Sequence, residues 1–121
     1  MDADQIVRTF CEHWNRSDVD AIVDCFTDDA LYHNIPMDPC QGKDAIRAFI
    51  GGMFGGMAKS VHFEIKHQVV NDLIVMNERI DTLVLQDREV RLPVCGIFEL
   101  TEGGKISECR DYFDLGQFTG Q

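Results

Sequence analysis

Apolar residues in the first fifth of the chain recur at helical spacing. Ile6, Phe10 and Trp14 lie four residues apart and predict one apolar stripe on a first helix of about 15 residues. Ser17, followed by Asp20 three residues later, resembles a capping box and predicts the start of a second, shorter helix that ends at residues 27–29. Four apolar residues are expected on its inner side: Val19, Ile22, Val23 and Phe26.

A short strand is expected at residues 30–34, stopped by two prolines, and a third helix is expected to begin near Lys43. Glycine pairs at 51–52 and 55–56 weaken this helix, because each interior glycine costs about 1 kcal/mol relative to alanine. We therefore expect its end to fray, kink or pack closely against a neighbour. Five apolar residues are expected to face inward: Ile46, Phe49, Ile50, Met53 and Met57.

The second half of the chain is rich in strand-forming residues. Runs at 61–70, 73–85, 89–100 and 105–114 are separated by short turns with suitable residues at 71–72, 86–88 and 103–104. Helices followed by an antiparallel meander are typical of an α+β domain. With 121 residues, the chain is expected to form one domain over 1–121, without a separate cofactor domain.

Charge narrows the range of partners. The chain has 11 Lys and Arg against 21 Asp and Glu, a formal net charge of −10. Nucleic acid and anionic membranes attract basic surfaces, so neither is expected as a partner, and the substrate is expected to be neutral and apolar. No apolar run is long enough to cross a bilayer, and the acidic N-terminus is unlike a signal peptide. The five scattered cysteines are interpreted as small buried apolar residues in a reducing cytoplasm.

Two predicted strands carry charged residues on faces that could point inward. Arg79, Asp81 and Leu83 share one face of their strand, and Asp111 shares a face with Phe113 on the last strand. If both aspartates point inward, the guanidinium of Arg79 could bridge them, since its rigid fork of donors can hold two carboxylates. Two carboxylates in opposite protonation states could open an epoxide, one as general base and the other as general acid. Spacing alone also fits a surface ion pair.

Four segments, in order along the chain, resemble the limonene-1,2-epoxide hydrolase family. The combined Y-x-N, R-x-D and R-D-Y-F-D set is far more specific than any single motif. The resemblance covers roughly residues 26–118 and is carried by Tyr32-His33-Asn34-Ile35-Pro36-Met37, Glu78-Arg79-Ile80-Asp81, Gly96-Ile97-Phe98-Glu99-Leu100-Thr101-Glu102-Gly103 and Arg110-Asp111-Tyr112-Phe113-Asp114.

The resemblance implies a fold, a dimer and a mechanism. The fold would be a cone of strongly curved mixed β-sheet wrapped by three N-terminal helices, like nuclear transport factor 2 and cystatin, usually as a homodimer. Asp111 would be the base, Asp81 the acid and Arg79 the bridge, while Tyr32 and Asn34 would hold the attacking water without any cofactor. The pocket would be lined by Leu83, Leu92, Val94 and Phe113, with Met53 and Met57 either joining them or serving as ordinary core methionines.

Other chemistries fit the sequence less well. The four histidines have no metal-ligand spacing, no G-x-S-x-G surrounds a serine, and the glycine pairs lack the G-K-[ST] of a phosphate loop. Two alternatives on the same fold remain open: a ketosteroid-isomerase-like or polyketide-cyclase-like enzyme, and a non-catalytic ligand-binding or dimerisation module. The glycine-rich segment and the chain ends differ from the pattern of the family, so the family's natural substrate is not assigned to this chain.

Overall fold

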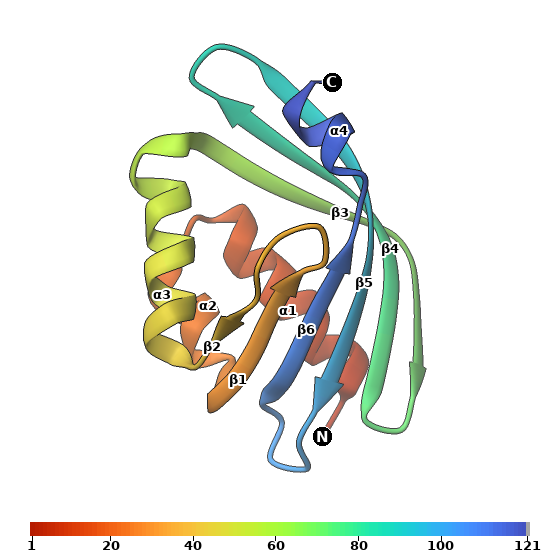
Figure 1. Cartoon of the computed structure of the whole chain (residues 1–121). Coiled ribbons are helices and arrows are strands. Elements are labelled where there is room, and N and C mark those ends of the chain that lie inside the picture. The colour runs from red at the N-terminus through yellow and green to blue at the C-terminus, as the bar shows by residue number, and fades with distance from the viewer. Residues whose placement is uncertain (121) are drawn as a thin grey trace.

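The structure is a computed structural model that describes residues 1–120. The sheet consists of six strands and is flanked by helices that come mostly from the first half of the chain (Figure 1). The helices are α1 (Ala3–Asn15), α2 (Val19–Asp24), α3 (Lys43–Gly52), the π-helical turn η1 (Met53–Met57) and α4 (Leu115–Thr119). The strands are β1 (Phe26–Asn34), β2 (Cys40–Gln41), β3 (Ala58–Asn71), β4 (Ile74–Leu85), β5 (Glu89–Leu100) and β6 (Ile106–Tyr112).

The sheet is mixed and strongly bent. Its strand order is β2-β1-β6-β5-β4-β3, with β1 parallel to β6 and every other neighbouring pair antiparallel. The helices α1, α2 and α3 lie on the inner side of the bend (Figure 1). This arrangement confirms the predicted α+β class, with N-terminal helices wrapped by a curved mixed sheet.

The second helix and the strand after it differ from the prediction. Asp18, not Ser17, caps α2, because its carboxylate accepts a 3.1 Å hydrogen bond from the backbone N–H of Ala21. Ser17 instead has a φ of 57° and turns the chain between α1 and α2. The helix also ends at Asp24, so Phe26 is buried as the first residue of β1 rather than as part of α2.

The glycine-rich end of α3 changes its hydrogen-bonding pattern, as the glycine pairs led us to expect. The helix passes into the π-helical turn η1, which is wider than an α-helical turn. Ile46 and Ile50 are fully buried, whereas Met57 is 41% exposed. The short elements β2 and α4 were not predicted, since two and five residues are too few for a periodic pattern.

An aromatic core joins α1 to the sheet. The ring of Phe10 makes edge-to-face contacts with Trp14, Phe26 and Phe98 at centroid distances of 6.4, 5.5 and 5.8 Å.

Along residues 1–120, no helix is long and apolar enough to span a bilayer.

The cysteines correspond only in part to the expected buried apolar residues. Cys11 and Cys109 are buried, Cys25 and Cys40 are half-buried, and Cys95 is exposed. The exposed position follows from strand alternation, because the side chains of β5 alternate between the two faces of the sheet and Cys95 is on the outer one.

Candidate active site

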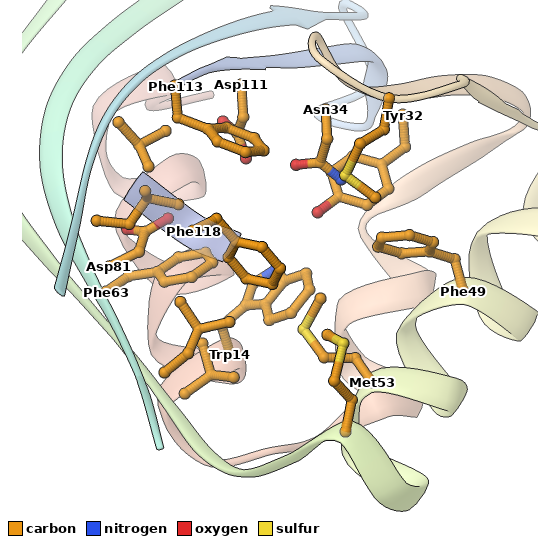
Figure 2. Close-up of a pocket in the computed structure, with 16 residues that line it drawn as sticks. Trp14, Tyr32, Asn34, Phe49, Met53, Phe63, Asp81, Asp111, Phe113 and Phe118 are labelled. Atoms are coloured by element: carbon orange, nitrogen blue, oxygen red, sulfur yellow. The ribbon is translucent and has the colours of Figure 1, made fainter. Parts of the chain in front are cut away.

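A cavity of about 130 Å³ lies between the bent sheet and the helices. A cavity of this size can hold a small organic molecule. Its walls are largely apolar, and four polar side chains known from the motifs reach it: Tyr32, Asn34, Asp81 and Asp111 (Figure 2). The six expected lining residues also lie on it, namely Met53, Met57, Leu83, Leu92, Val94 and Phe113.

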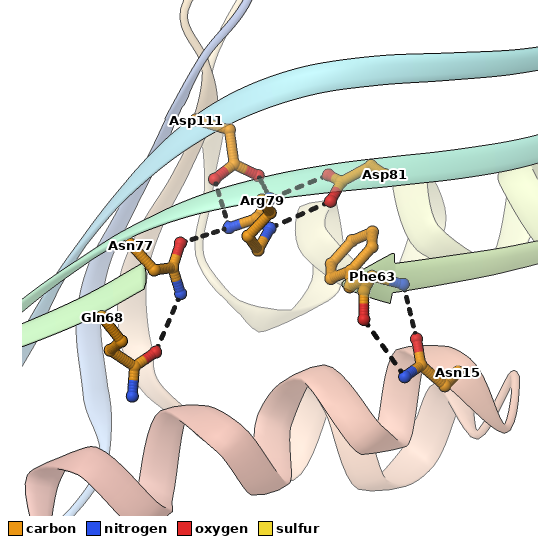
Figure 3. Close-up of polar contacts among 7 residues, drawn as sticks. All are labelled: Asn15, Phe63, Gln68, Asn77, Arg79, Asp81 and Asp111. Atoms are coloured by element: carbon orange, nitrogen blue, oxygen red, sulfur yellow. Dashed lines mark hydrogen bonds and ion pairs between the residues drawn. The ribbon is translucent and has the colours of Figure 1, made fainter. Parts of the chain in front are cut away.

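Arg79 lies behind the cavity and contacts both aspartates. Its side chain is completely buried. The guanidinium holds Asp81 through two parallel bonds, 3.0 Å from Nε to Oδ1 and 2.8 Å from Nη2 to Oδ2. It also contacts Asp111, at 3.2 Å from Nη1 to Oδ1 and 3.2 Å from Nη2 to Oδ2 (Figure 3). The structure therefore brings together the two carboxylates, which lie 30 residues apart in the sequence, through one arginine.

Strand alternation and register account for this placement. On β4 the buried side chains are those of every second residue, so Asn77, Arg79 and Asp81 all face the interior. On β5, Gly96 pairs with Asn77 on one side and with Asp111 on the other. The polar side chains of β4 and β6 thus approach each other across a residue that has no side chain.

Gly96 provides the space through which Arg79 reaches Asp111. A Cβ at this position would lie 2.9 Å from Oδ1 of Asn77 and 3.0 Å from Oδ1 of Asp111, and would overlap Nη1 of Arg79. In the sequence, Gly96 was recognised only as part of a motif segment. A single glycine inside a strand pattern is a recognised signal of close approach and could have identified it.

A chain of hydrogen bonds also connects the guanidinium to helix α1. The side-chain oxygen of Asn77 accepts a 3.1 Å bond from Nη1 of Arg79, and its amide donates at 3.0 Å to Gln68. Gln68 in turn donates to the carboxylate of Asp4 on α1 at 2.8 Å. Asn77 was missed at the sequence level, although it stands two residues before Arg79 on the same strand face.

The face of the guanidinium rests on an aromatic ring. The Cζ atom of Arg79 lies 4.6 Å from the ring centroid of Phe63 on β3, within cation–π range. The backbone of Phe63 is tied to α1, since its N–H donates at 2.6 Å to Oδ1 of Asn15 and its carbonyl accepts at 3.4 Å from Nδ2 (Figure 3). Hydrogen bonds in the plane of the guanidinium and the Phe63 ring against its face therefore hold Arg79 in place.

Burial and neighbouring charges shift the pKa values of the titratable groups in the site. Burial raises the pKa of Asp81 above the ordinary 3.8, an effect that the Arg79 charge opposes and the nearby Asp111 charge reinforces. Burial alone would lower the pKa of Arg79, but the charges of Asp111 and Asp81 outweigh it and raise this pKa well above its ordinary value. Burial thus favours the protonated form of Asp81 more than in a free aspartate, beside a permanently charged guanidinium.

Tyr32 and Asn34 complete the polar end of the cavity from β1. They are two residues apart on one strand face, and β1 runs parallel to β6 in a register that pairs Asn34 with Asp111. Burial, and next the Asp111 charge, raise the pKa of Tyr32 well above 10, so its hydroxyl stays neutral and able to donate. Figure 2 shows Asp111, Asn34 and Tyr32 along one side of the cavity.

Six further lining residues were not assigned to the site from the sequence: Trp14, Met37, Phe49, Val61, Phe63 and Phe118. Trp14 was interpreted as part of the apolar stripe of the first helix, and it also lines the cavity. Phe118 reaches the cavity from α4, a short helix without a sequence pattern. The tertiary structure alone places these side chains on the wall.

Residues 7–109 match the model of the SnoaL-like domain family, so the chain belongs to this family. Among known relatives, the epoxide hydrolase EphG of Mycobacterium tuberculosis is 32% identical over 111 residues, which span 90% of this chain and 71% of that protein. The resemblance to limonene-1,2-epoxide hydrolase-like proteins that the motifs indicated is thereby confirmed.

Solved structures agree with the fold. The LEH-like epoxide hydrolase of M. tuberculosis superimposes with a TM-score of 0.85 at 28% identity, over 98% of this chain and 87% of that chain. A cystatin-fold protein from Novosphingobium aromaticivorans superimposes with a TM-score of 0.80 at 25% identity, over 92% and 97% of the two chains.

Proposed function

We propose that this protein is a cofactor-independent epoxide hydrolase that adds water to a small apolar epoxide in one step to give a vicinal diol. One observation carries the proposal: a buried arginine holds two carboxylates at the polar end of an otherwise apolar cavity. Supporting it, the relative EphG and a structurally similar mycobacterial protein are epoxide hydrolases.

Asp111 is the general base of the proposed reaction. A water held by Asp111, Asn34 and Tyr32 attacks one carbon of the epoxide ring and gives up a proton to the Asp111 carboxylate. Because this water is already held next to the epoxide ring, its attack no longer depends on a chance encounter, and the barrier to the step is lower. Each carboxylate oxygen of Asp111 has two lone pairs and one contact with Arg79 at 3.2 Å, so each can also accept a hydrogen bond from water.

Asp81 is the general acid. As the ring carbon–oxygen bond breaks, the departing oxygen takes the proton of the Asp81 carboxyl, whose pKa burial has raised. After the step Asp111 is protonated and Asp81 is ionised. Transfer of this proton from Asp111 to Asp81, which share the Arg79 guanidinium, restores the starting state, and atoms and charge balance without an outside reactant.

Arg79 is the common partner of both carboxylates throughout. Its fixed positive charge compensates whichever of them is ionised, so the negative charge that moves from Asp111 to Asp81 remains paired. A preorganised charge of this kind stabilises the transition state without reorganising during the reaction.

The decisive experiment measures diol formation and the source of its oxygen. Purified protein is incubated with limonene oxide, cyclohexene oxide and styrene oxide, beside the Asp111→Asn variant. A single turnover in ¹⁸O-labelled water with enzyme in excess should put one label into every diol formed. Unlabelled diol would show that a protein carboxylate attacks first and would refute the one-step mechanism. Absence of any diol would favour an isomerase, a cyclase or a ligand-binding module.

We also propose that the protein acts as a homodimer through the outer face of its sheet. Val69 on β3, Met76 on β4 and Ile97 on β5 are side by side in the strand register. Val69 is 64% exposed and Met76 is 40% exposed, so they form part of an apolar strip on the solvent side. Burial of such a strip against a second copy would follow from the hydrophobic effect.

A further inference from the structure

The indole N–H of Trp14 is buried without a hydrogen-bond partner. Over the 120 residues that the structure describes, it is the one buried side-chain nitrogen or oxygen that lacks a partner, and the side chain is only 1% exposed. Buried donors in folded proteins are nearly always bonded, because leaving one unpaired forfeits the bond it would make with water. The exception therefore requires an explanation.

This N–H belongs to the cavity wall. Trp14 lines the cavity together with Tyr32, Asp81 and Asp111. Figure 2 shows the indole nitrogen on the side of the ring that faces the middle of the lining residues. The donor is thus directed toward the middle of the lining side chains.

The indole ring is held in this orientation by its neighbours. It stacks on Phe63, with ring centroids 5.0 Å apart and planes inclined by 24°, and it contacts Phe54 at 5.6 Å. Phe63 is itself fixed by the bonds between its backbone and Asn15. A ring packed in this way cannot turn its nitrogen elsewhere without losing these contacts.

Within residues 1–120, no acceptor lies within hydrogen-bonding reach of this donor. The carboxylates of Asp81 and Asp111 are engaged by Arg79 and, in the proposed reaction, by the epoxide oxygen and the attacking water. An indole nitrogen only donates, so its missing partner must be an acceptor.

We infer that Trp14 Nε1–H binds a second oxygen atom of the substrate, separate from the epoxide oxygen. The substrate class is then a small, mostly apolar epoxide that also carries a carbonyl, ether or hydroxyl oxygen. This inference rests on the proposed function for the identity of the reacting group. A site with a buried donor discriminates strongly against an analogue that leaves the donor unpaired.

A binding experiment tests the inference independently of turnover. Methyl cyclohexyl ketone and isopropenylcyclohexane have nearly the same shape and differ by a carbonyl oxygen in place of a methylene group. Isothermal titration calorimetry on the wild type should show about tenfold tighter binding of the ketone, the ratio expected for one buried hydrogen bond. Equal affinities of the wild type for the two compounds would overturn the inference, whatever the variants show. The ketone oxygen would then gain nothing from the indole N–H that water does not already supply.

Two variants assign the preference to the N–H. Trp14→Phe keeps an aromatic ring but removes the donor, so the ratio of the two affinities should fall to about one. Phe54→Leu changes the packing against the indole without removing a donor, and Phe54 does not line the cavity, so it should keep the wild-type ratio. Retention of the ketone preference in Trp14→Phe would overturn the inference.

A turnover experiment connects the donor to the reaction. The matched pair is 4-acetyl- and 4-isopropenylcyclohexene 1,2-epoxide, compared by the ratio of their kcat/KM values. We expect this ratio to favour the acetyl compound in the wild type and to fall about tenfold in Trp14→Phe. Ketone-selective binding with no diol from either epoxide would refute the proposed function while supporting the donor site, so the two failures are distinguishable.

Discussion

Arg79 and Asp81 form a two-point pair, with N–O distances of 3.0 and 2.8 Å, whereas the contacts of Arg79 with Asp111 are 3.2 Å. The two carboxylates are therefore not equivalent, although one guanidinium serves both. Asp81 is held in the plane of the fork with a raised pKa, and Asp111 keeps more freedom to accept a bond from water. This asymmetry is consistent with the proposed roles of Asp81 as acid and Asp111 as base, which the family resemblance implied.

Replacement of the proposed base should abolish catalysis without unfolding the protein. Asp111→Asn keeps the shape of the side chain and an oxygen for Arg79 but cannot take a proton at neutral pH. We expect kcat to fall by about 10²–10⁴, the usual contribution of a general base. Diol assays measure the loss. Asp87→Asn, an exposed carboxyl in the turn between β4 and β5, is the control and should keep full activity. Comparable activity in both variants would exclude Asp111 as the base.

The proposed acid predicts the direction of one limb of the pH profile. Asp81 acts in its protonated form and its pKa is raised, so kcat/KM should decline as the pH rises through that pKa, above 3.8. In Asp81→Asn this limb should disappear, and the remaining activity should be lower by about 10²–10⁴. Profiles of kcat/KM against pH for both proteins test this. A wild-type limb that persists unchanged in the variant belongs to another group.

Loss of the bridging arginine should make stability depend more strongly on pH. In Arg79→Met, Asp81 loses the charge that lowers its pKa, so the folded pKa rises further above the unfolded value. Stability is then fully present below the unfolded pKa and is lost as the pH rises through the folded pKa. We expect a deficit of about 3–5 kcal/mol at pH 7 and a smaller one near pH 4, measured by urea unfolding.

The control for this variant is Arg91→Met, which removes an exposed arginine from the outer face of β5. Its free energy of unfolding should remain within about 0.5 kcal/mol of the wild type at both pH values, as is usual for surface substitutions. A deficit in Arg79→Met that is the same at pH 4 and pH 7 would show that lost packing, not charge, is responsible.

A side chain at position 96 should displace Arg79 and Asp111 from the positions they take in the site. In Gly96→Ala the new methyl group would overlap Nη1 of Arg79 and press on Asp111, so the guanidinium must shift. We expect at least about a tenfold loss of kcat and a destabilisation of about 1–3 kcal/mol, typical of overpacking. Gly51→Ala on α3 is the matched control, because a Cβ there meets open space and should stabilise the helix by up to about 1 kcal/mol. Full activity in Gly96→Ala would contradict the close approach.

The proposed dimer is tested by placing a charge in the apolar strip. Met76→Lys should shift the protein from dimer to monomer in sedimentation velocity experiments, because an unpaired charge buried in an interface is strongly unfavourable. Gln86→Lys, in the turn after β4, adds the same charge away from the strip and should leave the dimer intact. A wild-type protein that sediments as a monomer would refute the dimer itself.

Much of the fold follows from local patterns. The stripe formed by Ile6, Phe10 and Trp14 predicted α1, and the alternation along residues 73–85 predicted β4 with Arg79 and Asp81 on one face. Both signals are strong because each element buries one face over many residues. The start of β1 at Phe26 was missed, because an apolar residue just after a helix fits the helical pattern as well as the strand.

The sequence by itself determined the class of fold, the motif residues and which of them share a strand face, since these depend on backbone periodicity and residue type. Only the tertiary structure decided that Gly96 stands between Asn77 and Asp111, that the indole N–H of Trp14 has no partner, and that Phe118 returns to the cavity. These relationships depend on strand register, on sheet curvature and on contacts between segments far apart in the chain. Local propensities do not encode such long-range geometry, because it results from packing the whole core at once.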